Sequence, residues 1–166
     1  DHITLLNAFK IVNDNFFDWT LHLVGKEFND DYALSIKTFI KQNNLENHVF
    51  VYGSCPDISN ILNQSDIGVL SSKSEGLPVS LLEYGLIKLP VVATNVGDCN
   101  KVISNTNEGI LVEPDNDIVL SKAISKLIED KDLRNVIAEN LHQKVVSSFS
   151  ESKSIDSLMK IYKQYQ

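Results

Sequence analysis

A polar turn between an apolar run and a helix-like segment carries the densest group of chemically useful residues in this sequence. It spans Ser71–Pro78 and reads Ser-Ser-Lys-Ser-Glu-Gly-Leu-Pro. The first N–H groups of a helix lack partners and lie at the positive end of its dipole, so a phosphate binds well at such a turn. Taken alone, the turn favours an ordinary strand-to-helix connection capped by Ser74 or Glu75.

A second carboxylate close to this turn in the sequence strengthens the case for a ligand site. Glu83 lies eight residues after Glu75, early in the predicted helix, between leucines and Tyr84. A carboxylate near a helix start can accept two hydrogen bonds from a vicinal diol such as a ribose. The alternative is a solvated glutamate paired with Lys88 or with a backbone amide.

Hydrophobic periodicity predicts the elements that must position these residues. Short apolar runs predict strands over 19–24, 49–52, 66–70, 91–94 and 109–112. Helical spacing predicts helices over 3–13, 31–43, 57–64, 79–88, 117–129, 131–148 and 151–165. Pro78 suits the first turn of the helix that follows it, because the missing N–H would have no partner there.

The strands alternate with helices and are continuous apolar runs. This pattern predicts an α/β fold, a doubly wound parallel sheet with helices on both faces. Ligands of such sheets bind outside the carboxyl ends of the strands, where the Ser71–Pro78 turn would lie. Such domains normally begin with a strand, whereas this chain begins with a helix. We therefore expect a sheet that lacks its first strand, in a fragment of a larger protein.

Length and composition fit a single globular domain. The chain has 166 residues, 43% hydrophobic and 22% charged, with a net charge of −7. Such an acidic chain is a poor ligand for nucleic-acid backbone, and its apolar runs are too short to span a bilayer. Cys55 and Cys99 show no metal or redox spacing, so we expect free thiols in a reducing, cytoplasmic compartment.

Other site chemistries find no support in the sequence. The four histidines are scattered without metal-ligand spacing, so no zinc or iron site is expected. The sequence also lacks an Asp-x-Asp motif, a Gly-x-Ser-x-Gly elbow, a Gly-x-Gly-x-x-Gly loop and a Walker lysine loop. We expect no metal and no cofactor.

The whole string 66–85, followed by 89–97, resembles the donor-binding half of family-4 retaining glycosyltransferases. Those enzymes have two Rossmann-like halves and a Glu-x7-Glu signature, matched here by Glu75 and Glu83 within Ser-x-x-Glu-Gly-x-Pro. Segments 21–25, 49–53 and 108–114 also match. The resemblance implies that residues 1–166 form one Rossmann-like, nucleotide-sugar-binding domain, the C-terminal half of a two-domain enzyme whose N-terminal half is absent.

The resemblance also implies roles for individual residues. Glu75 would be the catalytic glutamate that contacts the donor sugar, and Glu83 would hydrogen-bond the ribose. The remaining donor-binding residues are a base-facing pair, three backbone donors and a leucine near the nucleoside: Ser54 and Cys55; Gly76, Leu77 and Val79; Leu82. Cys55 has the alternative of being a small buried hydrophobe.

Two departures from the family pattern affect what this chain can do. The family's first strand, with an arginine and a lysine that clamp the diphosphate, is absent, and neither Lys26 nor Lys73 matches that clamp. Charge-assisted hydrogen bonds contribute about 1.5–3 kcal/mol each, so diphosphate affinity should be lower. Gly97-Asp98 replaces the usual Gly-Gly, which bears on sugar or acceptor preference. We expect this chain alone to transfer no sugar.

The implied activity of the full enzyme is transfer of a sugar, with retention of configuration, from a nucleoside diphosphate sugar. A UDP-sugar is the expected donor, and the acceptor would be a glycan or a lipid-linked sugar bound by the missing half. Family analogy points to bacterial surface polysaccharide or capsule synthesis, at the inner face of the cell membrane. No nucleic-acid partner is expected.

Two other classes of function stay open at this point. A nucleotide-sugar epimerase shares the two-half fold, but the Glu-x7-Glu spacing argues against it. A non-catalytic, nucleotide-binding α/β module would keep the fold without transfer activity. The presence of both Glu75 and Glu83 argues against such a module, although the missing strand leaves it open.

Overall fold

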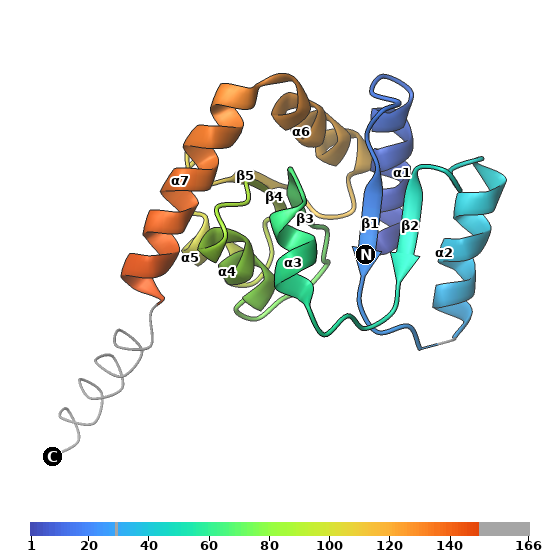
Figure 1. The fold of residues 1–166 in the computed structure, drawn as a ribbon, viewed down its shortest axis with the longest axis horizontal. Helices are drawn as coiled ribbons and strands as arrows, with labels where there is room; N and C mark the ends of the chain where they lie inside the picture. Colours follow the sequence, from blue (N-terminus) through green and yellow to red (C-terminus); the bar gives the residue numbers. More distant parts are fainter. Residues whose placement is uncertain (29, 150–166) are drawn as a thin grey trace, which may run out of the picture.

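The computed structural model describes residues 1–28 and 30–149, where helices and strands alternate (Figure 1). The strands are β1 (Leu21–Val24), β2 (Val49–Tyr52), β3 (Gly68–Leu70), β4 (Val91–Thr94) and β5 (Ile110–Val112). The helices are α1 (His2–Asn13), α2 (Asp31–Gln42), α3 (Ile58–Asn63), α4 (Val79–Leu86), α5 (Cys99–Val102), α6 (Asp117–Glu129) and α7 (Lys131–Ser148). The helix predicted over 151–165 lies outside the described residues.

Most elements agree with the sequence prediction, and a few differ. The short helix α5 was not predicted. Pro78 is the N-cap of α4 rather than part of its first turn. The helix was expected to reach Lys88, but Lys88 has a left-handed backbone (φ 59°). The N–H groups of Lys88 and Leu89 donate to the carbonyls of Gly85 and Tyr84, a Schellman motif that ends α4 two residues early.

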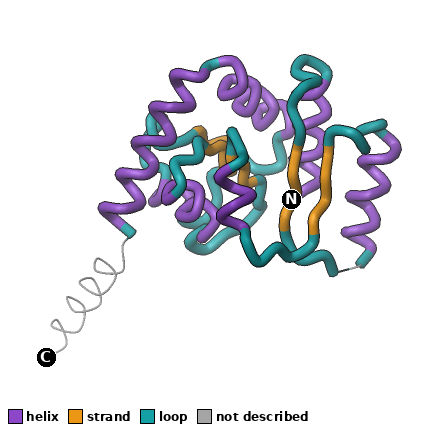
Figure 2. Tube along the Cα trace, viewed as in Figure 1, coloured by secondary structure: helices purple, strands orange, loops and turns teal. Residues whose placement is uncertain are grey.

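All the paired strands are parallel, as predicted, but they form two sheets rather than one (Figure 2). In the first sheet β1 pairs with β2, and Leu21 is opposite Val49. In the second sheet β4 lies between β3 and β5, with Gly68 opposite Val91. Among the described residues, β1 and β3 are therefore sheet edges that lack a partner on one side.

Helices cover both faces of the larger sheet, as the apolar strands indicated. Every residue of β4 is buried, and successive side chains point to opposite faces. Val92 belongs to a core formed with α1, α2 and α6. Val91 and Ala93 belong to a second core formed with α4 and α5. The long helix α7 contributes to both cores. None of the described helices is long and apolar enough to cross a membrane.

Candidate functional site

The Ser71–Pro78 turn connects the carboxyl end of β3 to α4, at the sheet edge where ligands of parallel sheets bind. Two buried hydroxyl groups hold its first residues. The Ser71 hydroxyl donates to the carbonyl oxygen of Asp1 at 2.9 Å, and the Thr94 hydroxyl donates to the carbonyl oxygen of Ser72 at 2.6 Å. The turn is therefore fixed both to the start of α1 and to the end of β4.

The carboxylate of Glu75 is held in place by its own turn and by a neighbouring loop. The Ser72 hydroxyl donates to Glu75 Oε1 at 2.6 Å, which leaves the other carboxylate oxygen free of hydrogen bonds among the described residues. Gly97 adopts φ 52°, and a Cβ added there would lie 1.9 Å from the carbonyl oxygen of Glu75. The Asp98 N–H donates to the carbonyl oxygen of Gly76 at 3.0 Å. The loop at Gly97 thus packs directly on the backbone of Glu75 and Gly76.

The start of α4 offers unpartnered donors. No side chain caps this helix, so the expected alternative of a cap by Ser74 or Glu75 is wrong. Within the described part of the chain, the N–H groups of Val79 and Ser80 have no acceptor. The side chain of Val79 is 63% exposed, so this helix start is open to an incoming anion.

Glu83 lies one turn into α4 and is half-buried. Across residues 1–28 and 30–149 its carboxylate forms no hydrogen bond or ion pair. Lys88, the expected alternative partner, instead pairs with Glu139 of α7 at 2.7 Å. Burial, and secondarily the charge of Glu83, raises the pKa of the neighbouring Tyr84 to about 12. The carboxylate of Glu83 thus lies unpaired, among the described residues, beside the Tyr84 phenol.

A groove of about 640 Å³ runs between β1 and β3, and Glu83 is the one predicted site residue that lines it. The side chain of Leu82 instead packs against the core beneath α4. Leu77 is 45% exposed, and Gly76 is also exposed. Glu75, Gly76, Leu77 and Val79 therefore share one surface turn, and Glu83 borders the groove beside it.

The structure does not join Ser54 and Cys55 to this turn. Both residues follow β2, in the other sheet, and both are exposed. Cys55 is a free, exposed thiol, so the alternative of a buried Cys55 is wrong. Cys99 is free as predicted, and burial raises the pKa of its thiol.

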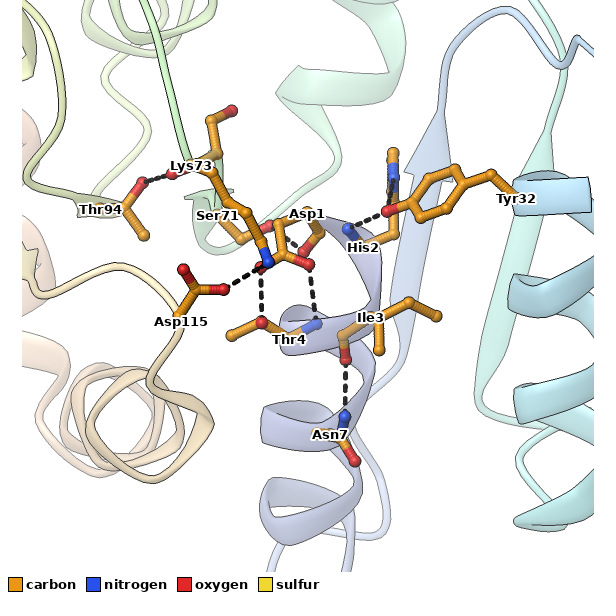
Figure 3. A network of polar contacts seen from close by, with 11 residues as sticks. Asp1, His2, Ile3, Thr4, Asn7, Tyr32, Ser71, Lys73, Thr94 and Asp115 are labelled. Carbon is orange, nitrogen blue, oxygen red and sulfur yellow. Dashed lines mark hydrogen bonds and ion pairs between the residues drawn. The ribbon is translucent and has the colours of Figure 1, made fainter.

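The two lysines near the strand ends are already engaged, Lys73 in the network of Figure 3 and Lys26 with an aromatic ring. Lys73 pairs with Asp115 and lies 3.5 Å from Asp1 Oδ2. Lys26 lies over the ring of Phe28, 5.0 Å from its centroid. Neither lysine is therefore poised as a free clamp for a diphosphate.

Sequence reasoning missed several residues that hold the site. Thr94 acts through a contact with Ser72 that no local pattern reveals. Ser72 was visible in the Ser-x-x-Glu motif, but no role was predicted for its hydroxyl. Asp1 could have been found, because an aspartate just before an apolar, helix-periodic segment is typical of a helix N-cap. Asp1 accepts hydrogen bonds from the Thr4 N–H at 3.2 Å and from the Thr4 hydroxyl at 2.6 Å. The described residues contain no group of three His, Cys, Asp or Glu side chains that could hold a metal ion.

Comparison with known proteins adds a family context. Residues 1–144 match the family model described as glycosyl transferases group 1. The UDP-Gal:alpha-D-GlcNAc-diphosphoundecaprenol alpha-1,3-galactosyltransferase of Escherichia coli is 32% identical over 119 residues, 72% of this chain and 30% of that enzyme.

Solved structures show the same fold. One is the C-terminal domain of a glycosyl transferase group 1 family protein (LpcC) from Francisella tularensis. Its TM-score is 0.81 at 25% identity, over 89% of this chain and 78% of that chain. Anabaena HepE in complex with UDP has a TM-score of 0.89 at 24% identity, over 97% of this chain and 44% of that chain. These matches confirm the predicted α/β fold, and this chain spans less than half of the length of HepE and of the galactosyltransferase.

Proposed function

This chain belongs to the family of group 1 glycosyltransferases, which are retaining enzymes, and from that premise we propose a donor-binding role for it. Residues 1–166 form the nucleotide-sugar-binding domain, the C-terminal half of a two-domain transferase. The observation that carries this proposal is the uncapped start of α4, flanked by the carboxylates of Glu75 and Glu83. Unpaired N–H groups suit a diphosphate, and two carboxylates suit hydroxyl groups.

Each part of the donor has a matching group in this proposal. The N–H groups at Gly76, Leu77 and Val79 face the sugar hydroxyls and the diphosphate. Glu83 accepts hydrogen bonds from the ribose. Glu75, oriented by Ser72, stabilises the positive charge that develops on the sugar as the diphosphate leaves.

The base and the nucleoside take the remaining predicted residues. Ser54 and Cys55 lie against the base, and Leu82 supports the nucleoside from the core side. The exposure of Ser54 and Cys55 is compatible with contact to a ligand that reaches the end of β2. The proposed donor is a UDP-sugar, which the name of the Escherichia coli relative supports.

The acceptor belongs to the whole protein rather than to this domain. The galactosyltransferase relative acts on a diphosphoundecaprenol-linked sugar, so we propose a lipid-linked or glycan acceptor, bound by the other half of the enzyme. Surface polysaccharide synthesis at the cytoplasmic face of the membrane follows from that acceptor class. Because the chain covers 30% of that relative, we propose that the isolated domain transfers no sugar.

A calorimetric titration tests the donor proposal. UDP, GDP and ADP are each titrated into the chain, into Glu83→Ala and into a control, Glu129→Ala, on the exposed side of α6. We expect UDP to bind best, and Glu83→Ala to weaken its binding about tenfold, because hydrogen bonds to a charged group are lost. Equal affinity in Glu83→Ala and wild type would contradict the ribose role. Failure of all three nucleotides to bind, both here and in a longer form with the upstream region, would overturn the proposal.

A further inference from the structure

The loop that follows β4 places a charged residue against the turn that carries Glu75. Gly97 packs on the carbonyl of Glu75, and its left-handed backbone and the lack of space exclude a side chain at this position. Asp98 is the next residue, and its N–H donates to the carbonyl oxygen of Gly76 at 3.0 Å. The backbone of Asp98 is therefore fixed directly beside the turn.

The carboxylate of Asp98 is only partly used by its own helix. Asp98 precedes α5, where an aspartate commonly caps the first N–H groups, but its side chain forms no cap hydrogen bond. Its Oδ1 instead pairs with Lys101 Nζ at 2.9 Å, with the two side chains 39% and 66% exposed. Such an exposed ion pair adds little to stability. The other oxygen, Oδ2, has no partner among the described residues.

The carboxylates of Glu75 and Asp98 lie close to one common point, the buried thiol of Cys99. Burial raises the pKa of this thiol, and the negative charges of Glu75 and Asp98 raise it further. Charges act in this way only over short distances. Both carboxylate side chains are half-buried. Glu75 and Asp98 thus border the same region of the surface.

The position of Asp98 relative to the donor follows from the proposed function, on which this inference rests. In that proposal Glu83 binds the ribose, the start of α4 binds the diphosphate, and Glu75 meets the sugar. Asp98 is bonded to Gly76, next to Glu75 and on the far side of the turn from Glu83 in the chain. Asp98 therefore belongs to the sugar end of the donor site.

The charges at this end of the site indicate what kind of sugar it accepts. Glu75 and Asp98 contribute two negative charges, and Lys101 offsets one of them. Lys73, the cation of the turn itself, is already paired with Asp115. A carboxylate accepts hydrogen bonds from sugar hydroxyl groups, whereas it repels the carboxylate of a uronic acid. The sugar end of the site thus favours an uncharged, hydroxyl-rich ligand.

We propose that Asp98 is a specificity-determining residue, which accepts a hydrogen bond from a hydroxyl group of the transferred sugar. Lys101 holds the Asp98 carboxylate through Oδ1, and Oδ2 accepts from the sugar. Together with Glu75, Asp98 selects an uncharged hexose over a uronic acid.

Calorimetric titration of the full-length enzyme separates the sugar from the nucleotide. UDP, UDP-glucose, UDP-galactose, UDP-N-acetylglucosamine and UDP-glucuronate are titrated into wild type, Asp98→Gly and Asp98→Asn. For the uncharged sugar nucleotide that binds wild type best, we expect Asp98→Gly to weaken binding about tenfold and to change UDP affinity by less than twofold. UDP-glucuronate should bind about threefold more tightly to Asp98→Asn than to wild type. Asp132→Asn, an exposed carboxylate of α7, is the matched control and should change none of these affinities.

Four results would overturn the proposal. An unchanged affinity of Asp98→Gly for that sugar nucleotide would remove the contact with the sugar. An equal fall for UDP and for the sugar nucleotide would show that Asp98 only supports the turn. UDP-glucuronate that binds wild type as well as the best uncharged donor, or that gains nothing in Asp98→Asn, would contradict the selection by charge. Failure of UDP itself to bind wild type would overturn the donor proposal and this one with it, whereas the first three results leave the donor proposal intact.

Discussion

Replacing Gly97 by alanine should be among the most damaging single-methyl changes in this chain. The new Cβ would lie 1.9 Å from the Glu75 carbonyl oxygen and 2.7 Å from its carbonyl carbon, so the two loops must separate by about 1 Å. The left-handed backbone costs a non-glycine residue about 1 kcal/mol. Overpacking adds about 1–3 kcal/mol, and loss of the bond from Asp98 to Gly76 adds about 1 kcal/mol. We expect the free energy of unfolding to fall by about 3–5 kcal/mol.

Urea unfolding followed by the fluorescence of Trp19, the single tryptophan, measures this loss. Gly25→Ala is the matched control, because an added Cβ there meets nothing within 4 Å. Gly97→Asn separates the two causes, since asparagine tolerates a left-handed backbone but brings the same Cβ. A loss below about 0.5 kcal/mol in Gly97→Ala would refute the tight packing of the two loops. Near-wild-type stability of Gly97→Asn would show that the backbone conformation, rather than the contact with Glu75, carries the cost.

Three further outcomes follow from the packing and the site. Gly85→Ala places a Cβ 2.5 Å from Val145 Cγ2 and should lower the free energy of unfolding in urea by about 1–3 kcal/mol. An unchanged midpoint of urea unfolding would contradict the close approach of α4 and α7. The pKa of Tyr84 is raised to about 12, so the unfolded chain loses this proton first as the pH rises above 10. The free energy of unfolding should therefore fall by about 2 kcal/mol between pH 10 and 12. Urea unfolding measured across this pH range should show a correspondingly smaller fall for Tyr84→Phe. Ser72→Ala removes the hydrogen bond to Glu75. We expect kcat of the full-length enzyme to fall about tenfold, while the UDP affinity measured by calorimetry stays within about twofold. An equal fall in kcat and in UDP affinity would show that Ser72 supports the fold of the turn rather than the orientation of the carboxylate.

Helix boundaries could be predicted where a polar residue marks them. Asp30, Asn116 and Asp130 accept the N–H three residues ahead, and the helices that follow start where the sequence predicted. Helix α5 was missed because it is a single turn, formed as Cys99 and Val102 become fully buried. Burial of these two residues depends on the rest of the fold, so local hydrophobic periodicity does not predict the helix.

The part of the site that depends on local sequence was predictable, and the part that depends on long-range contacts was not. The spacing of Glu75 and Glu83 was visible along the chain; Glu75 lies in the turn before α4 and Glu83 one turn into α4, as expected. The long-range contacts that hold this turn were not visible, because Thr94 at the end of β4 and Gly97 in the loop after it lie about twenty residues later in the chain. The split between the sheets was also hidden, since strand pairing depends on neighbours distant in sequence.

The separation of the two sheets also bears on how the molecule opens. No backbone ladder joins β1 to β3 among the described strands, and α1 meets α6 through side-chain packing. Detachment of the elements β1, β2, α1 and α2 would therefore break no strand pairing of β3, β4 or β5, although it would open the core that α1 shares with α6. The turn that carries Glu75 would survive such an opening only in part, because it would lose the bond from Ser71 to Asp1. Partial unfolding of the first third of the chain is thus coupled to the order of the turn at the other sheet.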